Sequence, residues 1–469
     1  MTNAPRHFSA LAKRSSEPPI SWLMKLALDR PDLISLAVGF TDNETLPVEE
    51  VGALTRAILQ RPKTARAALQ YGTTIGLLQL RRELLRRWQK QDGISKSRIT
   101  TDDIVVTDGS QQLLYLVSEV LCDPGDIVIV EDPTYFVYLG IVEAMGIRAV
   151  GFAPFDPAVG RLCESAPAPT PLRRSGLQHL ESRLQDLKRR RLLSRLKMLY
   201  LVTYFQNPTG RTWSLEMRRE LLAIVKHYER AAGHPIYIVE DAAYRDLRFE
   251  GDPAVAGFKS LDLRNERVIY TNTLTKPFAT GFRLGYGILP PSLGRAVLRS
   301  KGNHDFGTSN FLQTILARAL AEGLYDCHQP VIAAAYRRKR DAMIEELGKV
   351  GQASSLSSRG TGILPVHQPE RGRAGSPSHK TGRMPTLRFN KPHGGMYIWV
   401  ELDPGVNTGV KSRLFKRALD AGVLYVPGEM CYCNDPSRTI PQNCMRLSFG
   451  APTIQQIQKG IRLLANALG

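Results

Sequence analysis

The sequence predicts an α/β fold in which helices cover a mostly parallel central sheet. Short apolar runs alternate with segments of helical periodicity along most of the 469 residues, and this alternation is typical of parallel sheets. Hydrophobic residues make up 43% of the chain and charged residues 23%, which is an ordinary globular composition. A chain of this length favours about two or three structural units in one compact protein.

The expected elements follow from the spacing of apolar residues. Helical periodicity marks residues 76–92, where Leu77, Leu80, Leu84 and Trp88 fall on one stripe. Short apolar runs predict strands at 104–107, 126–132, 197–203, 236–241 and 267–273, and residues 387–402 alternate as a further strand. The chain ends in an amphipathic helix. Ligands of open α/β sheets bind beyond the carboxyl ends of the strands, so the polar turns there are the first place to look for a site.

Two basic segments carry most of the net charge of +19. Residues 158–197 contain ten Lys or Arg and three Asp or Glu, and residues 351–389 contain six and one. Neither has the interleaved aromatics or recognition helix of a nucleic-acid reader, so we expect no nucleic-acid binding. We interpret 158–197 as a solvated insert, a loop followed by a surface helix, and 351–386 as a disordered insert.

Other features limit the class of protein. No apolar stretch approaches the roughly 20 residues of a membrane span, so no membrane partner is expected. The N-terminus lacks the apolar core of a secretory signal, which favours the cytoplasm. Cys431 and Cys433 form a lone C-x-C without a second pair at metal-ligand spacing, so we expect no metal.

Lys276 lies in TNTLTKPFATGFRLGYG, a polar turn after a predicted strand. A lysine in a loop is usually a solvated surface group, and Schiff-base chemistry needs one whose pKa is lowered. The segment is nearly free of acids, and Arg283 follows seven residues later. Hydroxyls and an arginine beside the amine suit an anionic phosphate ester.

Asp241 ends the apolar run IYIVED, and Tyr244 follows three positions later. A carboxylate at a strand's carboxyl end could pair with a pyridinium nitrogen, because only the protonated ring withdraws electrons strongly. The alternative is a helix N-cap with a packed tyrosine. From this segment alone, both interpretations remain open.

Two further turns could bind a ligand. In VVTDGSQQLL, backbone N–H groups at a helix start and the Ser110 hydroxyl could bind a phosphate, although an ordinary capped helix has the same pattern. In FQNPTG, Asn207 precedes a proline that fixes the turn. An isolated NPTG is an ordinary turn signal, so neither segment is decisive alone.

Taken together and in this order, with the aromatic segment DPTYF between them, these segments resemble the fold-type I pyridoxal-phosphate aminotransferases of class I/II. The resemblance covers roughly residues 20–157 and 197–465. Within the family, LQYGTTIG, GSQQLL, FQNPTG and VPGEMCY are most similar to the branch with 2-aminoadipate and kynurenine aminotransferases and MocR-like regulators.

The resemblance implies a transaminase that moves an amino group from an L-amino acid to a 2-oxo acid by a ping-pong mechanism. Lys276 would hold pyridoxal 5′-phosphate as a Schiff base and act as the proton-transfer base. The other cofactor-binding residues would be Asp241 at the pyridine nitrogen, Asn207 and Tyr244 at the phenolic oxygen, Tyr135 against the ring, and Ser110, Gln111, Thr273, Thr275, Arg283 and Tyr71 at the phosphate.

On the substrate side, the resemblance assigns Arg446 in CMRLSFG to the α-carboxylate, together with Asn207 and Gly39. Tyr71 would reach the phosphate of the neighbouring subunit, so a homodimer is implied. The family fold adds a smaller α+β domain built from both ends of the chain. We expect residues 1–44 to join it, 45–310 to form the large cofactor-binding domain, and 311–469 to form the rest of the small domain.

Two other functions remain open. The same scaffold supports pyridoxal-phosphate-dependent lyases and decarboxylases, because the bond that breaks depends on its angle to the ring. A non-catalytic, cofactor-sensing regulator of the MocR kind is the second alternative. Such regulators carry a winged helix ahead of this domain, and fewer than 40 residues precede ISLAVGF, so we do not expect a regulator.

Overall fold

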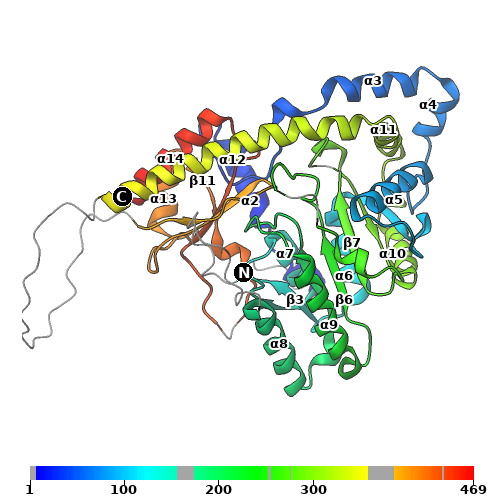
Figure 1. Cartoon of the computed structure of the whole chain (residues 1–469), viewed down its shortest axis with the longest axis horizontal. Coiled ribbons are helices and arrows are strands. Elements are labelled where there is room, and N and C mark those ends of the chain that lie inside the picture. The colour runs from blue at the N-terminus through cyan, green and yellow to red at the C-terminus, as the bar shows by residue number, and fades with distance from the viewer. Residues whose placement is uncertain (1–6, 156–173, 252–254, 275, 357–384, 436–437) are drawn as a thin grey trace, which may run out of the picture.

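The computed structural model describes residues 7–155, 174–251, 255–274, 276–356, 385–435 and 438–469. A large sheet with helices on both faces occupies one side of the molecule, and a smaller antiparallel sheet occupies the other (Figure 1). The long helix α12 (Leu324–Leu356) runs across both. The α/β class predicted from the sequence is confirmed.

The large sheet has seven strands in the order β2-β8-β7-β6-β5-β3-β4. Neighbours from β7 to β4 pair in parallel, whereas β8 runs antiparallel to both β2 and β7. The carboxyl ends of the other six strands therefore meet at one edge. The strands are β2 (Ile104–Asp108), β3 (Ile127–Glu131), β4 (Arg148–Phe152), β5 (Leu196–Val202), β6 (Tyr237–Asp241), β7 (Val268–Thr273) and β8 (Leu284–Ile288).

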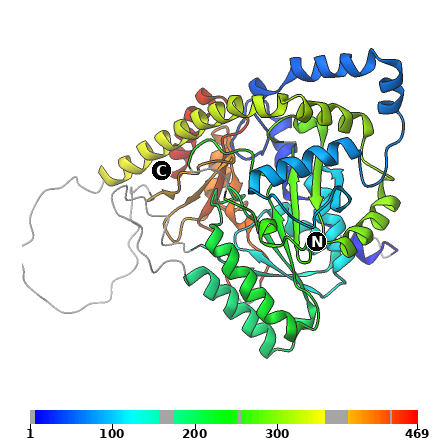
Figure 2. The same cartoon turned by 45° about the vertical axis from the view of Figure 1, so that its right-hand side comes forward.

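Side chains of the central strands enter two different cores, as the two-residue period of a strand requires. In β3, Ile127 and Ile129 face one core, and Val128 and Val130 face the other. The helices α8 (Arg174–Arg189) and α9 (Leu215–Ala232) cover the first face and lie side by side in Figures 1 and 2. The second face is covered by α6 (Gly109–Leu121) and α7 (Phe136–Met145).

The remaining helices surround these layers. The predicted stripe over 76–92 forms α5 (Leu78–Asp92), in which Leu80, Leu84 and Trp88 are buried. The others are α1 (Ala10–Arg14), α2 (Pro19–Asp29), α3 (Val48–Leu59), α4 (Pro62–Leu69), α10 (Pro291–His304), α11 (Asn310–Ala321), α13 (Arg413–Asp420) and α14 (Ile454–Leu468).

The smaller sheet is built from the C-terminal part of the chain. Its antiparallel strands are β9 (Arg388–Phe389), β10 (Tyr397–Glu401), β12 (Val426–Pro427) and β13 (Cys444–Ser448). A separate parallel pair joins β1 (Ile34–Ser35) to β11 (Val423–Leu424). The N-terminal segment is thereby held beside the C-terminal strands, as expected for the smaller α+β unit.

Three expectations need correction. Residues 284–287, interpreted as part of a polar turn, belong to β8, which continues to Ile288. The second half of the expected insert 158–197 contains α8, whose Leu177, Leu180, Leu184 and Leu187 are buried in the core between α8, α9 and the sheet. The expected insert at 351–386 begins too early, because α12 continues to Leu356. The rest of both inserts, 158–173 and 357–384, lies outside the described residues.

Candidate active site

The predicted site residues gather at the carboxyl edge of the large sheet. Asp241 is the last residue of β6, Asn207 follows β5, and Lys276 follows β7. Ser110 lies in the first turn of α6, directly after β2. Arg283 precedes β8, the antiparallel strand that begins at this edge. The sheet thus brings side chains from the ends of four strands together at one place, because Lys276 and Arg283 share the connection between β7 and β8.

The Lys276 amine lies over the ring of Tyr244, with Nζ 4.8 Å from the ring centroid. Burial lowers the pKa of Lys276 to about 8, the nearby Asp241 carboxylate opposes that shift, and the cations Arg283 and Arg446 add to it. A lysine with this pKa is partly neutral near physiological pH. It can therefore attack a carbonyl or accept a proton, which a solvated lysine does poorly.

Asp241 is 4% exposed and accepts two hydrogen bonds. The Tyr200 hydroxyl donates to it over 2.8 Å, and the Ala243 backbone N–H donates over 3.1 Å. Burial raises the pKa of Asp241, and a cation beside this carboxylate would oppose that shift and favour the ionised form. The interpretation of Asp241 as a helix N-cap is not supported, because no helix begins there.

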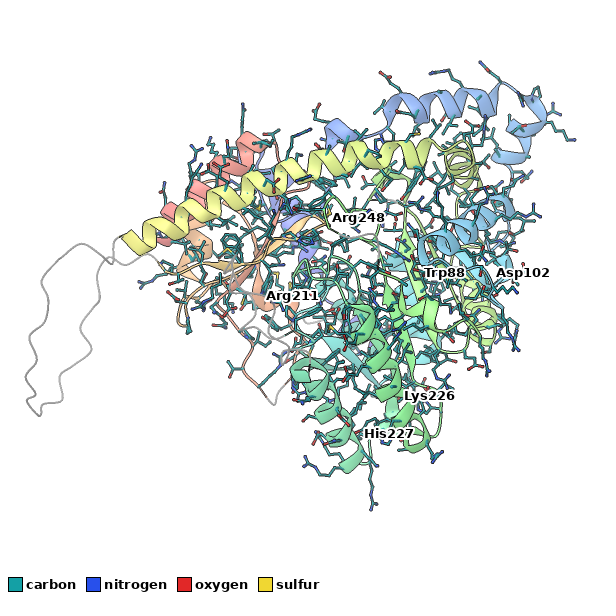
Figure 3. All side chains as sticks on the ribbon, viewed as in Figure 1. Trp88, Asp102, Arg211, Lys226, His227 and Arg248 are labelled. Atoms are coloured by element: carbon teal, nitrogen blue, oxygen red, sulfur yellow. The ribbon has the colours of Figure 1, made fainter. Side chains whose placement is uncertain are left out.

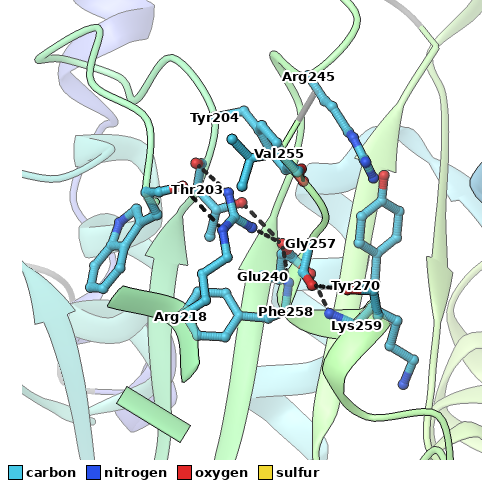
Figure 4. A network of polar contacts seen from close by, with 12 residues as sticks. Thr203, Tyr204, Arg218, Glu240, Arg245, Val255, Gly257, Phe258, Lys259 and Tyr270 are labelled. Carbon is cyan, nitrogen blue, oxygen red and sulfur yellow. Dashed lines mark hydrogen bonds and ion pairs between the residues drawn. The ribbon is translucent and has the colours of Figure 1, made fainter. Parts of the chain in front are cut away.

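A buried ion pair supports the strand that carries Asp241 (Figure 4). Arg218 Nη1 lies 2.6 Å from the carboxylate of Glu240, and both side chains are fully buried. Glu240 also accepts hydrogen bonds of 2.8 Å from the backbone N–H groups of Phe258 and Lys259. These bonds fix the end of β6 from the face opposite to the site.

Asn207 links two other predicted residues. Its Nδ2 donates to the Tyr244 hydroxyl over 3.1 Å, and its Oδ1 accepts from Arg446 Nη1 over 2.9 Å. Arg446, in β13, also donates to the Ala37 carbonyl over 2.6 Å. Its buried Nε has no hydrogen-bond partner in the described part of the chain. The N-terminal segment containing Gly39 therefore reaches the C-terminal strand at this point.

Arg283 lies against the start of α6. A Cβ atom on Gly109, at φ +71°, would come within 2.9 Å of Arg283 Nη2. The N-terminus of α6 and this guanidinium together favour an anion. In the next residues, Ser110 lies in the first turn, and the buried Oε1 of Gln111 has no hydrogen-bond partner among the described residues.

Four other residues predicted for the cofactor site lie outside the contacts described so far. Thr273 is at the edge, but its hydroxyl donates to the Leu284 carbonyl within the sheet. Tyr135 precedes α7 and is half-buried, and its electrostatic neighbours include Asp241 and Arg446. Tyr71 is 83% exposed and packs its ring on Phe306, 5.7 Å away. Thr275 lies outside the described residues.

The structure adds residues that the motifs did not single out. Tyr397 stacks its ring on the Arg446 guanidinium at 4.1 Å, and Phe136 lies near the same guanidinium at 5.3 Å. Tyr200 holds Asp241 from the neighbouring strand. Aromatic residues inside apolar runs look like core positions. In the sequence, the one feature that could have pointed to Tyr200 and Tyr397 is that they lie in segments next to predicted site residues.

A lysine of lowered pKa, a buried strand-end carboxylate and an anion cradle at a helix start define a pyridoxal-phosphate enzyme of fold type I. The family described as aminotransferase class I and II matches residues 31–374 of the sequence. The chain belongs to this family. It is an aminotransferase, and its cofactor is pyridoxal 5′-phosphate.

Several named aminotransferases are similar to this protein along almost the whole chain. Aromatic-amino-acid aminotransferase 1 of Thermococcus litoralis is 33% identical over 99% of this chain and 94% of its own. The kynurenine aminotransferase of Pyrococcus horikoshii superposes with a TM-score of 0.78 at 32% identity, covering 99% and 97%. The α-aminoadipate aminotransferase of Thermus thermophilus, solved with N-(5′-phosphopyridoxyl)-L-leucine, gives 0.73 at 26%, covering 98% and 97%.

The described residues contain no group of three or more His, Cys, Asp or Glu side chains that could hold a metal ion. None of their helices has both the length and the apolar character that crossing a membrane would need.

Proposed function

We propose that Lys276, Asp241, Asn207, Tyr244 and Arg446 form the catalytic site of this aminotransferase. The observation that carries the proposal is the chain of contacts from the Lys276 amine to the Tyr244 ring, the Asn207 amide and the Arg446 guanidinium. It links an amine of lowered pKa to a buried arginine that can bind a carboxylate. An α-amino acid has a carboxylate that the arginine can bind, and an amine that can replace the Lys276 amine at the cofactor's aldehyde.

The residues fit the cofactor as follows. Lys276 would hold its aldehyde, Asp241 its ring nitrogen, and Asn207 and Tyr244 its phenolic oxygen. Tyr135 would lie against the ring, and Ser110, Gln111, Thr273, Thr275 and Arg283 would surround the phosphate. When bound, the cofactor supplies an electron-withdrawing ring that stabilises negative charge at the substrate α-carbon.

Side chains and backbone of this chain would have different roles in the reaction. Arg446 binds the α-carboxylate through two parallel N–H donors, a geometry that lysine cannot offer. The Lys276 amine would remove the proton at the substrate α-carbon and deliver it to the cofactor's C4′, for which a pKa near the working pH is suited. The Gly39 segment closes over the substrate. The first 2-oxo acid leaves before the second binds, which makes the reaction ping-pong.

Aromatic amino acids are the donors we propose. The named relatives act on aromatic amino acids, kynurenine and α-aminoadipate, and the aromatic rings of Phe136 and Tyr397 lie beside Arg446 in this chain. An aromatic substrate side chain can pack on such rings. The panel of donors to be tested therefore runs from phenylalanine and kynurenine to 2-aminoadipate.

We also propose a homodimer, with Tyr71 completing the neighbouring subunit's phosphate site. Its support is an exposed cluster of Leu69, Tyr71 and Phe306, which are 66%, 83% and 61% exposed, because large apolar residues gathered on a surface favour an interface. The division into a large and a small domain at 44 and 310, and the cytoplasmic location, remain predictions.

The test is the absorption spectrum of the purified holoenzyme, before and after each amino acid is added without a 2-oxo acid. We expect a visible cofactor band that amino acids convert, with release of the matching 2-oxo acid. Lys276→Ala should lose both. Lys226→Ala, on the exposed side of α9 (Figure 3), is the matched control and should keep both.

Each other outcome has a distinct meaning. Release of carbon dioxide or ammonia in place of a 2-oxo acid would support a decarboxylase or lyase. A band that responds to no amino acid would support the non-catalytic regulator. A full band and normal conversion in Lys276→Ala would refute the role given to Lys276.

A further inference from the structure

The ammonium group of Lys339 is buried where three parts of the chain meet. Lys339 lies on α12, the long helix that crosses both sheets (Figure 1), and its side chain is 8% exposed. Its Nζ lies 2.9 Å from a carboxylate oxygen of Asp42, whose side chain is 7% exposed. The same Nζ donates to the Gly450 carbonyl over 3.0 Å. One cation therefore joins the N-terminal segment to the residues that follow β13.

Asp42 fixes the N-terminal segment as well as pairing with Lys339. Its backbone N–H donates to the hydroxyl of Tyr336, which precedes Lys339 on α12, over 3.2 Å. Its carboxylate also accepts from the Glu44 backbone N–H over 3.3 Å, at the start of the short 3₁₀ helix η1 (Asn43–Thr45). A buried ion pair keeps such a geometry only while both charges are present, because either charge alone would have no partner to offset its desolvation.

The two segments that Lys339 joins lie against each other. A Cβ atom on Gly450 would come within 2.4 Å of the Phe40 carbonyl oxygen, so the two backbones are in direct contact. Farther along the same contact, the Ser448 backbone N–H donates to the Leu36 carbonyl over 2.7 Å. Lys339 therefore holds one end of this contact, and the pairing of backbone groups holds the other.

Arg446 bonds to the same N-terminal segment. Its Nη2 donates to the Ala37 carbonyl over 2.6 Å, and its Nη1 donates to Asn207 over 2.9 Å. The position of the N-terminal backbone therefore helps to determine how the guanidinium is presented. A shift of this backbone would turn Arg446 away from the geometry in which two parallel N–H donors meet a carboxylate.

We propose that Lys339 and Asp42 form a clamp that positions Arg446 for the α-carboxylate of the amino acid, acting through residues 36–42. Both are positioning residues, because they act through Arg446. The inference rests on the proposed function of Arg446 and adds the means by which the N-terminal segment is held beside it. It applies to every amino acid donor, because all of them present the same carboxylate.

Lys339→Met in the holoenzyme removes the cation and keeps an unbranched side chain. Stopped-flow absorbance of the bound cofactor, with an amino acid and no 2-oxo acid, gives a limiting rate and a half-saturating concentration. We expect the half-saturating concentration to rise about tenfold and the limiting rate to change by less than about threefold, because carboxylate binding is weakened equally in the ground state and the transition state. Lys349→Met is the matched control and should change neither, since Lys349 lies on the same helix, is 56% exposed and pairs with Glu345.

Asp42→Asn and the double variant test whether the two residues act as a pair. Asp42→Asn keeps the shape of the side chain, so it provides the same test if Lys339→Met does not fold, and it should also raise the half-saturating concentration. The double variant Asp42→Asn/Lys339→Met should be no worse than the more impaired single variant, because two residues in one ion pair are not additive. Additive effects would refute the clamp. So would a lowered unfolding temperature with an unchanged half-saturating concentration, which is the result expected of a role in stability alone.

Arg446→Lys distinguishes failure of the clamp from failure of the proposed function. It keeps the charge and loses the two parallel donors, so it should raise the half-saturating concentration by itself. If it does so and Lys339→Met behaves like Lys349→Met, the clamp is refuted while the site assignment stands. If Arg446→Lys leaves the half-saturating concentration unchanged, the role of Arg446 is refuted, and the inference falls with it.

Discussion

At the scale of single residues, the setting of Lys276 determines when its amine can react. Burial lowers its pKa to about 8 in the cofactor-free protein, and only the neutral amine attacks an aldehyde. The rate at which the apoenzyme incorporates pyridoxal phosphate should therefore rise with pH, with a midpoint of about 8.

Stopped-flow absorbance of the apoenzyme mixed with cofactor measures this rate. The exposed Arg283 and the buried Arg446 both lower the pKa of Lys276. Arg446→Gln should therefore shift the midpoint upward. A midpoint that stays near the ordinary lysine value of 10.5 would contradict the desolvated setting.

Glu131, at the end of β3, gives a second prediction at this scale. Its carboxylate is fully buried and accepts hydrogen bonds from Val202 and Trp213. Burial raises its pKa from 4.5 to about 7. Because the folded pKa is the higher one, its contribution to stability is present below pH 4.5 and is lost as pH rises to 7. The loss is about 3 kcal/mol.

Glu131→Gln cannot ionise, so its unfolding free energy should vary less between pH 4.5 and 7 than that of the wild type. Urea denaturation at a series of pH values measures the difference in slope. Parallel pH profiles for the two proteins would show that Glu131 does not titrate in this range.

The sequence motifs contain the residues that we propose for the cofactor site, but they do not contain the neighbours Tyr200 and Tyr397 that contact those residues. Lys276 and Asn207 are polar residues that follow apolar strands, and Asp241 ends one, which makes them visible in the sequence. Arg446 lies within β13 and was found through the family resemblance of CMRLSFG. Tyr397 sits within an apolar run, where an aromatic residue looks like core. Its contact with Arg446 depends on the pairing of β10 with β13, and local spacing does not contain that register.

At the scale of elements, β8 shows why a strand can be overlooked. Its sequence LGYGI has two glycines, which are uncommon inside strands. A Cβ on Gly285 would overlap the backbone of Gly109 and Ser110, and one on Gly287 would overlap Leu113. The glycines let α6 pack closely on the sheet, and the need for them arises only in the folded molecule.

The helix α8 gives the prediction at this scale. A solvated insert would tolerate changes everywhere, but Leu184 is fully buried against the sheet. Leu184→Ala should lower the unfolding free energy by about 2–5 kcal/mol. Arg189→Ala, five residues on in the same helix and 80% exposed, should change it by less than about 0.5 kcal/mol. Equal effects in thermal unfolding would restore the interpretation of α8 as a surface addition.

At the scale of the whole molecule, the position of Tyr71 predicts shared sites. If one subunit supplies Lys276 and its neighbour supplies Tyr71, Lys276→Ala and Tyr71→Ala proteins should each be impaired alone. Mixed after dissociation and reassembly, they should form heterodimers with one intact site. The expected recovery is roughly a quarter of wild-type activity.

Sedimentation would establish that the mixed sample is dimeric. Without such a gain in a confirmed dimer, Tyr71 would not complete a neighbouring site. The double variant carrying both substitutions on one chain, mixed with wild type, is the control. This mixture should show no gain in activity above that of the wild-type protein it contains, because its heterodimers have no intact site.

The order of strands also bears on how a newly made chain reaches its folded state. β2 ends at Asp108 and lies at the edge of the sheet, and its partner β8 begins at Leu284. During synthesis, β2 cannot pair until β8 has been made. Pairing between strands so distant in the sequence is slow and leaves apolar strands exposed to aggregation. Because β8 also packs Gly285 against Gly109, the anion cradle forms late. A nascent chain that stops before Leu284 could not retain the cofactor, however complete its earlier strands.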